Sequence, residues 1–321
     1  MRVLTGIQAS GDLHIGNYFG SIKQMVEAQK TSDTFTFIAN YHAMTSVSEG
    51  KRLAELTMQC ATDFLALGVD PEKSTFWVQS DVKEVLELYW ILSSFTPMGL
   101  LERAHSYKDK TAKGIAANHS LFSYPVLMAA DILLFSPDII PVGKDQIQHV
   151  EIARDIAIKF NNEYGDILKI PTFKVEEHVA TVPGTDGQKM SKSYGNTVNI
   201  FGEEKKQLKV IKKIVTEAVP LEESKQFEGC NVYNMAKLFL NDSELVDLQN
   251  RYTKGGEGHG HFKLYLAEVI WEYFREYREK RDYYEANQDE VREILSQGAK
   301  KASDIAKPMM EKIRAVTGIK Y

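Results

Sequence analysis

The 321-residue sequence has little cysteine, no long apolar run and no strong excess of either charge. Cys60 and Cys230 are its two cysteines, which is too few for a disulfide framework or a site of four thiolates, and a reducing compartment fits them. No apolar run approaches the length that crosses a bilayer, and the first residues lack the apolar core of a signal peptide. We therefore expect a cytoplasmic protein without membrane contact.

The charge is nearly balanced, with 39 Lys and Arg against 44 Asp and Glu and a formal net charge of −5. This balance excludes the strongly basic proteins that bind nucleic acids generally, but it leaves locally clustered basic residues available to a polyanion. Hydrophobic residues make up 43% of the sequence and charged residues 26%, as in ordinary globular proteins. A chain of this length is expected to form one large domain and a smaller one.

Short apolar runs alternate with amphipathic stretches in the first half of the chain. Strands are predicted at residues 3–7, 35–39, 74–79 and 137–142. Apolar residues at helical spacing predict helices after Asn17, over residues 51–67 and over about 146–161. This alternation is typical of an α/β fold, and we expect a Rossmann-like, doubly wound parallel sheet. Ligands of such sheets bind beyond the carboxyl ends of the strands.

Beyond about residue 200 the strand patterns give way to helical ones. Helices are predicted at residues 203–215, 231–240, 264–285, 289–297 and 302–316, and the four glycines between Tyr252 and His261 predict a loop. We therefore expect a Rossmann-like domain over residues 1–195, completed by a C-terminal helix at about 287–321. Residues 196–286 are expected to form an all-helical domain.

A glycine-rich turn joins the first predicted strand to the first predicted helix. Gly6, Gly11 and Gly16 let the backbone approach a ligand closely, and the helix that follows offers free N–H groups to an anion. His14 and Asn17 can donate hydrogen bonds to phosphate oxygens. The segment matches neither G-x-x-x-x-G-K-[ST] nor G-x-G-x-x-G, so it predicts a phosphate site of another kind. A turn that only caps the helix is the alternative.

A second segment with phosphate-binding chemistry runs from Lys189 to Ser193. Its sequence is Lys-Met-Ser-Lys-Ser, so two lysines and two hydroxyls lie within five residues, flanked by Gly187 and Gly195. The glycines permit movement, and the ammonium groups of Lys189 and Lys192 can close on a triphosphate. A solvated basic loop is the weaker alternative, because so specific a pentapeptide rarely arises by chance.

Together the two segments resemble the paired signature sequences of the class I aminoacyl-tRNA synthetases. They occur in the family's order, about 170 residues apart, and His14-Ile15-Gly16-Asn17 stands where the family has His-Ile-Gly-His. Asn17 is a departure that is usual in one subgroup, and residues 189–193 match the second signature without a change. The resemblance implies ATP-dependent activation of an amino acid, followed by its transfer to tRNA.

A single carboxylate interrupts the apolar stretch from Tyr124 to Phe135. An Asp on an otherwise apolar helix is costly unless it has a partner, and a carboxylate can only accept hydrogen bonds. Asp131 therefore suits a buried donor on a ligand, such as the N–H of an indole. A phenol O–H would fit almost as well, and a helix-capping or salt-bridged Asp is the structural alternative.

A strand-to-helix turn follows at Gly143–Gln146, where the backbone can bind a ribose or an ammonium group. Asp145 can accept hydrogen bonds from ribose hydroxyls. It can also cap the helix, since Gln148 follows three residues later, as in a capping box.

Several segments are similar, in their order along the chain, to the tryptophan-specific branch of the synthetase family: residues 6–11, 41–43, 124–131 and 143–155. The resemblance is close over about residues 1–200 and looser beyond. It implies L-tryptophan as substrate, with Asp131 accepting the indole N–H. The ring would be lined by Met128, Ile140 and Val142, and the amine and carboxylate would be held by His42, Tyr124 and Gln146. Contacts to ATP would come from Gln8, Ala9, Ser10, His14, Gly16, Asn17, Gly143, Lys144, Asp145, Val182, Lys189, Met190, Ser191, Lys192 and Ser193.

The same resemblance implies how the first reaction runs. The carboxylate of tryptophan attacks the α-phosphate of ATP and expels pyrophosphate, so positioning and positive charge replace a protein nucleophile. The groups that meet the developing charge would be Lys189, Lys192, Lys110, Asn17 and Mg²⁺. Lys110 can instead be a solvated loop lysine. Leu4 stands where relatives often carry an aromatic residue, so stacking on the indole from that side is not predicted.

The helical part of the chain predicts the second substrate. Five lysines cluster on one predicted helix, where they can contact phosphates or form a solvated face: Lys205, Lys206, Lys209, Lys212 and Lys213. The resemblance favours tRNA(Trp), with the helical domain reading the anticodon, and it implies a homodimer. Some relatives carry a cysteine metal site here, but Cys230, His259 and His261 are an incomplete ligand set, so no metal site is predicted.

Three other functions compete with this interpretation. A tyrosyl-tRNA synthetase shares the fold and both signatures. A nucleotidyltransferase that does not act on tRNA would use both phosphate segments but would not need the helical domain. A regulatory binding protein could keep the fold without catalysis, although Asn17, Lys189, Ser191 and Lys192 are all intact.

Overall fold

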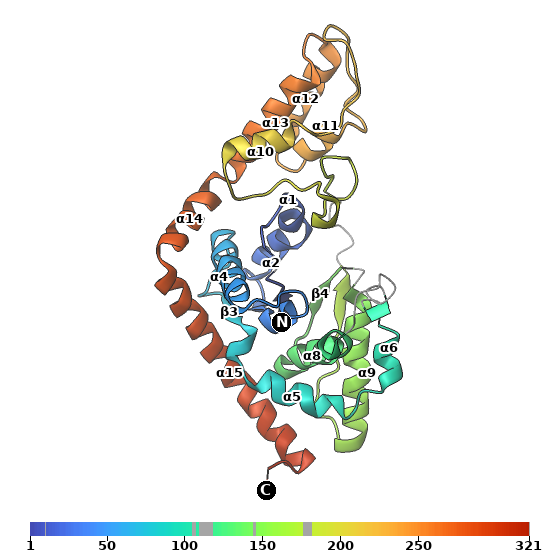
Figure 1. Ribbon diagram of the computed structural model, residues 1–321, viewed down its shortest axis with the longest axis vertical. Coiled ribbons are helices and arrows are strands. Elements are labelled where there is room, and N and C mark those ends of the chain that lie inside the picture. Colours follow the sequence, from blue (N-terminus) through green and yellow to red (C-terminus); the bar gives the residue numbers. More distant parts are fainter. Residues whose placement is uncertain (10, 105–106, 109–117, 144–145, 176–181, 321) are drawn as a thin grey trace. The chain divides into compact units, whose positions relative to one another are not determined.

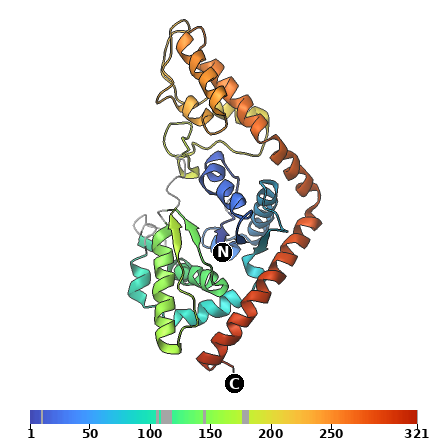
Figure 2. The ribbon, with the colours of Figure 1, turned by 180° about the vertical axis from the view of Figure 1, so that it is seen from behind.

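The computed structural model describes residues 1–9, 11–104, 107–108, 118–143, 146–175 and 182–320. Its contacts divide the chain into two compact units, each built from separate segments (Figures 1 and 2). The first unit comprises residues 1–11, 26–177 and 284–321, and the second unit comprises residues 12–25 and 178–283. The glycine-rich turn is therefore shared, because Gly6 and Gly11 belong to the first unit and His14 to Asn17 belong to the second.

Parallel strands form the centre of the first unit. Three strands pair in the order β1 (Arg2–Ile7), β2 (Asp33–Ile38) and β3 (Ser74–Val78), and β4 (Ile140–Val142) pairs with β5 (Phe173–Val175). A parallel bridge between Val3 and Ile139 places β4 beside β1. The order across both sheets is thus β3-β2-β1-β4-β5. The chain adds strands on one side of β1 as far as β3 and then crosses to the other side with β4, so the order of addition reverses between β1 and β4. Doubly wound sheets bind ligands at such a reversal, and the predicted α/β fold is confirmed.

Helices with apolar faces cover these strands. In α4 the side chains of Leu56, Cys60 and Phe64 recur at helical spacing and are buried. α8 begins after Asn118, whose side chain accepts a hydrogen bond from the backbone N–H of Leu121, and it packs against α5 and α9. The helices are α3 (Asn40–Ala43), α4 (Gly50–Ala66), α5 (Glu84–Ser93), α6 (Met98–Glu102), α8 (His119–Phe135), α9 (Ile147–Tyr164) and α15 (Gln288–Thr317).

Several residues of the candidate site directly follow the strands, at their carboxyl ends. Gln8 follows β1, Asn40 and the rest of α3 follow β2, Gln79 follows β3 and Gly143 follows β4. Gln79 opens a single 3-10 turn, η2 (Gln79–Asp81). Since parallel strands end at one edge of the sheet, the fold gathers these positions there.

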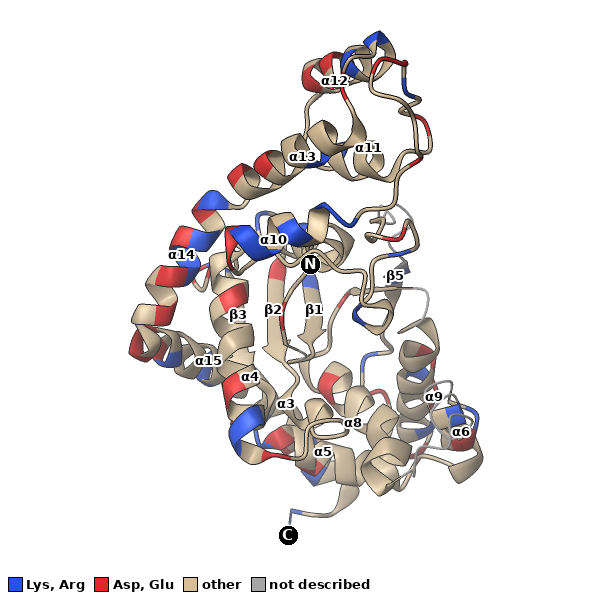
Figure 3. Ribbon diagram, turned by 45° about the horizontal axis from the view of Figure 1, so that its top comes forward, with Lys and Arg blue, Asp and Glu red and all other residues tan. Residues whose placement is uncertain are grey.

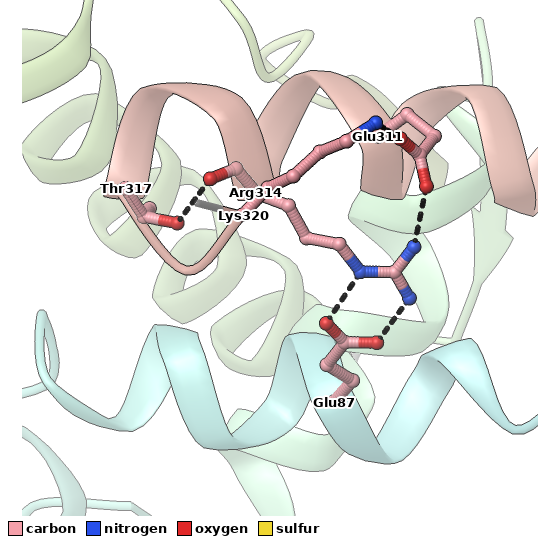
Figure 4. A network of polar contacts seen from close by, with 5 residues as sticks. All are labelled: Glu87, Glu311, Arg314, Thr317 and Lys320. Atoms are coloured by element: carbon pink, nitrogen blue, oxygen red, sulfur yellow. Dashed lines mark hydrogen bonds and ion pairs between the residues drawn. The ribbon is translucent and has the colours of Figure 1, made fainter.

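The last helix, α15, returns the end of the chain to the first unit, where it lies along β3 (Figures 1 and 2). Gly298 allows the close approach, because a Cβ atom there would lie 1.7 Å from the carbonyl oxygen of Phe76 in β3. Near the end of α15 the Arg314 guanidinium donates to both carboxylate oxygens of Glu87 in α5, with Nε at 2.7 Å (Figure 4). Glu311 accepts a further bond at 2.9 Å, and the two carboxylates, Glu87 first, raise the pKa of Arg314.

The second unit is helical in its described part. Its elements are α1 (Ile15–Asn17), the π-helical turn η1 (Tyr18–Ile22), the 3-10 turn η4 (Lys192–Tyr194), α10 (Glu204–Ile211), α11 (Asn231–Ala236), α12 (Asp242–Lys254) and α13 (His259–Tyr273). α2 (Lys23–Ala28) and α14 (Arg275–Ala286) cross the borders of the units. The hydroxyl of Tyr18 lies 2.9 Å from that of Tyr277, and its ring packs edge-on against Phe274. Tyr18 thereby links the helix after the glycine-rich turn to α14.

Several predicted helix boundaries were wrong. The helix expected at residues 264–285 is two helices, α13 and α14, separated at Phe274. The helices expected at 289–297 and 302–316 are one continuous helix, because Gly298 serves packing against β3 rather than ending the helix. α12 and β5 were not predicted, and the loop expected at Tyr252–His261 is confined to the four residues between Lys254 and His259.

No helix within the described residues is both long enough and apolar enough to cross a membrane. The division into a catalytic domain at residues 1–195 and an anticodon domain at 196–286 is a functional one, and it stays a prediction. The contacts alone place residues 284–321 with the sheet and residues 12–25 with the helical second unit.

Candidate active site

Asp131 is buried in α8, with an exposed fraction of 2%, against residues that follow β2 and β3. Nε2 of His42 lies 2.8 Å from its Oδ2 atom, and Nε2 of Gln79 lies 2.8 Å from both of its carboxylate oxygens. These donors offset the cost of a carboxylate held away from water. Because a carboxylate offers about four acceptor positions, the group can take a further donor from a ligand.

A second polar chain, of which only His149 is fully buried, lies beside the first. Gln146 Oε1 can only accept, so Nδ1 of His149, 2.9 Å away, is the donor between them. In a neutral His149 the Nε2 atom then accepts the hydrogen bond from the Tyr124 hydroxyl. The Tyr124 ring also faces the His42 ring edge-on, with their centroids 6.4 Å apart. The structure therefore joins His42, Tyr124, Asp131 and Gln146, four of the seven residues predicted to bind the amino acid.

The other three predicted residues are apolar and belong to one cluster. Ile140 and Val142 are 5% and 8% exposed and lie on the same side of β4, on either side of Pro141 in the sequence. Met128 stands three residues before Asp131 on α8 and packs, partly exposed, against the same cluster. Leu4 is buried in this cluster too. Relatives often carry an aromatic residue at its position, and stacking of Leu4 on the indole was not predicted.

Three of the residues predicted to contact ATP are described in the first unit. Gln8 is exposed directly after β1, and Ala9 is buried next to it. Gly143 is exposed after β4, and its carbonyl oxygen accepts a hydrogen bond from the backbone N–H of Gln146 at 2.9 Å. The remaining predictions in this unit, Ser10, Lys110, Lys144 and Asp145, lie outside the described residues.

The Lys189–Ser193 segment is held by one buried amide, that of Asn196 in the second unit. Asn196 is 2% exposed, and its Oδ1 atom accepts from the backbone N–H of Ser191 at 2.8 Å. Its Nδ2 atom donates to the carbonyl of Lys189 at 3.1 Å and to the Asp186 carboxylate at 2.8 Å. Gly184 leaves room for this side chain, since a Cβ atom there would lie 2.2 Å from Asn196 Nδ2.

The Lys189–Ser193 segment has both buried and exposed side chains. Met190 is 4% exposed, and its backbone N–H donates to the carbonyl of Val182 at 2.9 Å, so both predicted residues belong to the interior. Lys189, Lys192 and Ser193 are exposed, and the hydroxyls of Ser191 and Ser193 lie 2.9 Å apart. The backbone turns at Gly195, whose φ of +63° is a left-handed conformation. The buried Met190 thus lies in the same short segment as the exposed cations of Lys189 and Lys192.

The two signature segments lie side by side in the second unit. The backbone N–H of Gly16 faces the Met190 sulfur at 3.4 Å, and a Cβ atom at Gly16 would lie only 3.3 Å from Met190 Cβ. Ile15 donates to the carbonyl of Val198 at 3.0 Å, just beyond the second signature. The Asn17 side chain accepts from the backbone N–H of His14 at 3.0 Å, which closes the turn. Segments about 170 residues apart in sequence are therefore neighbours within one unit.

His14 is neutral at neutral pH. Burial, with the positive charge of Lys192 as a smaller cause, lowers the pKa of His14 to about 4. Within the described part of the chain, its buried Nδ1 atom has no hydrogen-bond partner. A neutral imidazole can still donate one hydrogen bond to a phosphate oxygen, as predicted, without adding charge.

Three residues at the site were not predicted: Gln79, His149 and Asn196. Gln79 and His149 are buried, but polar residues stand near both in the sequence, so neither interrupts an apolar run as Asp131 does. Asn196 follows the second signature by three residues, and an Asn after a glycine is also the ordinary sign of a turn. Their roles come from contacts, which the sequence does not give.

The three residues considered as an incomplete metal-ligand set, Cys230, His259 and His261, lie in a region of aromatic packing. Cys230 Sγ lies 3.5 Å from the Tyr252 hydroxyl, and the Tyr252 ring stacks on Phe262 with the centroids 3.8 Å apart. His259 and His261 begin α13 beside them. Among the residues that the structure describes, no three His, Cys, Asp or Glu side chains form a group that could hold a metal ion.

The fold and the site define a class of protein: a doubly wound α/β protein in which a glycine-rich turn lies beside a loop with exposed lysines. A sequence model of the family described as tRNA synthetases class I (W and Y) matches residues 1–275. The chain therefore belongs to this family of tryptophan and tyrosine class I tRNA synthetases. The ATP-dependent chemistry expected from the two signatures is that of the family.

Individual relatives agree with the family match. A tryptophan–tRNA ligase of Campylobacter jejuni is 62% identical over 319 residues, which cover 99% of this chain and 100% of the relative. One from Fusobacterium nucleatum is 50% identical, covering 99% and 98%. The crystal structure of the Campylobacter jejuni tryptophanyl-tRNA synthetase complexed with ADP and tryptophan has a TM-score of 0.97, at 62% identity and 99% and 100% coverage.

Proposed function

We propose that this chain activates L-tryptophan with ATP, forming tryptophanyl-adenylate, and transfers the tryptophanyl group to the 3′ end of tRNA(Trp). Asp131 carries the proposal, because it is a buried carboxylate that keeps acceptor capacity beyond its contacts with Gln79 and His42 and so suits the indole N–H, which can only donate. Relatives named tryptophan–tRNA ligase share 62% and 50% identity with nearly the whole chain. A tyrosyl-tRNA synthetase structure from Archaeoglobus fulgidus shares the fold but only 18% identity.

Recognition of tryptophan divides between the two polar chains. Asp131 accepts the indole N–H, while Met128, Ile140 and Val142 line the ring. Tyr124 and Gln146 hold the amine and carboxylate, and their common contact with His149 fixes both side chains. His42 lies between the two chains, since it hydrogen-bonds to Asp131 and faces the Tyr124 ring.

The triphosphate of ATP is bound by the second unit. Lys189 and Lys192 extend from a loop whose backbone is held by Asn196, so the ammonium groups can follow charge as it builds on the phosphates. His14, Gly16, Asn17, Val182, Met190, Ser191 and Ser193 form the turn and the loop around them. The family resemblance also implies contacts to ATP from Gln8, Ala9, Ser10, Lys110, Gly143, Lys144 and Asp145. Attack by the tryptophan carboxylate needs no protein nucleophile, because correct positioning supplies much of the rate.

Magnesium enters this proposal as part of the nucleotide substrate. The exposed donors of the loop are lysines and hydroxyls, and its Asp186 carboxylate is engaged by Asn196, which lowers the pKa of Asp186. Such a donor set fits phosphate oxygens better than it fits Mg²⁺, whose preferred ligands are carboxylates and water. The ion would neutralise charge on the phosphates when bound with ATP.

The exposed lysines of α10 and its end support a tRNA site in the second unit. Lys205, Lys206, Lys209, Lys212 and Lys213 are all exposed and form a basic stretch in Figure 3. Lys206 is paired with Glu203 at 2.7 Å, and such surface pairs contribute little stability, so they exchange readily for phosphate contacts. Residues 196–286 would read the anticodon.

A homodimer is supported by α5, which exposes apolar side chains one turn apart. Trp90 is 74% exposed and Leu86 41%, and Met98 at the start of α6 is 63% exposed. Large exposed apolar groups that lie close together mark protein contacts more often than free surface. Trp90→Glu is expected to yield monomers in sedimentation, where the unchanged chain sediments as a dimer.

Amino-acid-dependent exchange of pyrophosphate into ATP tests the activity across all twenty amino acids. Tryptophan alone is expected to support exchange at micromolar to millimolar concentrations, and the enzyme is expected to charge tRNA(Trp). Exchange driven by tyrosine instead would reassign the substrate. Exchange with tryptophan but no charging would leave a nucleotidyltransferase, and no exchange at all would leave a binding protein.

A further inference from the structure

Gln79 is a buried amide that none of the predicted roles includes. It follows β3 directly and is 1% exposed, in the apolar surroundings of Val78 and Val82. An amide in such a place must satisfy both its acceptor and its donors, or its burial is costly. Its two kinds of polar atom have different partners, which determine what the side chain does.

The orientation of the Gln79 amide is set from outside the site. Its Oε1 atom accepts a hydrogen bond from the backbone N–H of Tyr41 at 3.0 Å. Because a backbone N–H can only donate, Oε1 must face Tyr41 and Nε2 must face Asp131. The opposite orientation would oppose two N–H donors at Tyr41 and place an amide oxygen against the carboxylate. The contact with Tyr41 thus fixes which polar atom meets Asp131.

The amide in turn fixes the carboxylate. Nε2 of Gln79 lies 2.8 Å from both Oδ1 and Oδ2 of Asp131, so it is centred on the carboxylate. His42 adds a second donor to Oδ2 alone, at 2.8 Å. Among the described residues, Oδ2 therefore accepts from two donors and Oδ1 from one. Oδ1 is the oxygen with more acceptor capacity left for a ligand.

We infer that Gln79 is a positioning residue that determines specificity: held by Tyr41, it orients Asp131 so that Oδ1 accepts the donor of the substrate. The inference deepens the proposed function and rests on it, since the donor is the indole N–H of tryptophan. Gln79 acts through Asp131 and does not itself touch the substrate. Its loss should therefore weaken recognition of the N–H and leave the ring, the amine and ATP bound as before.

Two substrates separate this role from a merely structural one. Pyrophosphate exchange is measured with tryptophan and with its benzothiophene analogue, in which sulfur replaces the indole N–H. Gln79→Met keeps the length of the side chain and removes its N–H donors. It is expected to lower kcat/KM for tryptophan about ten- to hundredfold, mainly through KM, the size of one charge-assisted hydrogen bond. For the sulfur analogue the loss is expected to stay below about threefold.

Further variants keep the test independent of folding. Gln79→Glu retains the shape but presents an oxygen to Asp131, so it should lower kcat/KM for tryptophan at least as much as Gln79→Met. Ser80→Ala, at the next residue, removes a hydroxyl that contacts Asn40 and not Asp131, and should leave the ratio between the two substrates unchanged. Adding Gln79→Met to Asp131→Ala should lower kcat/KM for tryptophan by less than about twofold more.

The outcomes are distinguishable. Equal losses for tryptophan and the sulfur analogue in Gln79→Met, with the unchanged enzyme active on tryptophan, would overturn the role of Gln79 and leave the proposed function standing. Additive losses in the double variant would also overturn it. An unchanged enzyme that fails to exchange with tryptophan at all would remove the proposed function and this inference together. A selective loss on tryptophan, absent from Ser80→Ala, supports the inference.

Discussion

Asp131 and Lys192, the two side chains on which the proposed reaction most depends, lie in opposite surroundings. Asp131 is 2% exposed in the first unit, and its carboxylate accepts hydrogen bonds from Gln79 and His42. Lys192 is exposed in the second unit, on a loop whose buried anchors are Met190 and Asn196. One group is buried and held by protein donors before any ligand arrives, while the other is an exposed side chain.

The difference follows from what each region must bind. Tryptophan is apolar with one ring donor, so it is distinguished by a dry pocket in which an unmatched acceptor is costly. A triphosphate is highly charged and changes its charge distribution during reaction, so adaptable cations serve it better than a fixed pocket. Under the proposed function, loss of Asp131 and loss of Lys192 should therefore have separate effects.

The largest effect is expected from Lys192→Ala. Removing the ammonium group should lower the rate of tryptophanyl-adenylate formation about a hundred- to a thousandfold, while the dissociation constant of ATP changes much less, because the charge matters most in the transition state. Single-turnover kinetics and calorimetric ATP titration measure the two quantities. Lys30→Ala, at another exposed lysine, is the control and should change neither. Equal losses in rate and ATP affinity would contradict a loop that acts on the transition state.

Asp131→Ala should break the other side of the comparison. Without the buried acceptor, KM for tryptophan is expected to rise about a hundredfold, with KM for ATP nearly unchanged. Steady-state pyrophosphate exchange gives both constants. Asp131→Asn, which keeps the volume but can turn a donor to the indole, should be affected almost as strongly. A tryptophan KM within a factor of two of the original would remove Asp131 from recognition.

The lowered pKa of His14 in the second unit predicts how the free energy of unfolding depends on pH. Its pKa in the folded chain is about 4, below its usual value of 6.5, so the unfolded chain binds a proton first as the pH falls. This contribution to stability is complete above pH 6.5 and is lost between pH 6.5 and 4, by an amount on the order of 3 kcal/mol or less. Chemical denaturation of the wild type and His14→Gln across this range measures it. Parallel pH profiles would show that His14 is not buried as a neutral group.

The anchor of the basic loop predicts a smaller loss of stability. Asn196→Ala removes the side chain that joins the backbone of Lys189 and Ser191 to Asp186, and should lower the free energy of unfolding by about 1–3 kcal/mol. It should also slow adenylate formation while tryptophan selectivity stays the same. Asn199→Ala, at an exposed Asn nearby, is the matched control for denaturation and kinetics. A variant that binds tryptophan more weakly would contradict the separation of the two regions.

The smallest effect is expected at the far end of the first unit. Arg314→Gln breaks the paired hydrogen bonds to Glu87. The side chains of Arg314 and Glu87 are 27% and 34% exposed, so the substitution should lower the free energy of unfolding by only about 1 kcal/mol. Neither exchange kinetics nor amino-acid selectivity should change. Thermal denaturation with and without salt measures the loss, which should shrink as salt screens the pair. A change in the KM for tryptophan would show that the contact between α15 and α5 affects recognition of the amino acid.

Much of the fold was predictable because it depends on local patterns. The strands β1, β2 and β3 are five or six residues long and rich in apolar and β-branched residues, and α4 and α9 have clear apolar faces. β5 has only three residues, too few for any periodicity, and is defined by its pairing with β4. The continuity of α15 through Gly298 was not predicted, since the strand that requires a glycine there lies more than 200 residues away in sequence.

The site was predictable where a residue is chemically out of place. Asp131 in an apolar helix and two lysines within a glycine-flanked pentapeptide are unusual in themselves. Gln79 is unremarkable in sequence and gains its role from a carboxylate 52 positions away and from the backbone of Tyr41. The distribution of the phosphate residues between units is likewise a property of contacts, which no spacing encodes.

The ratio of kcat/KM for tryptophan to that for tyrosine, measured in parallel for the wild type, Lys192→Ala and Asp131→Ala, tests the division most directly. We predict that Lys192→Ala loses most of its rate but keeps this ratio within about threefold of wild type, because selection is complete before the phosphates react. Asp131→Ala is expected to lose most of the ratio. A Lys192→Ala enzyme whose ratio falls as far as that of Asp131→Ala would contradict the account.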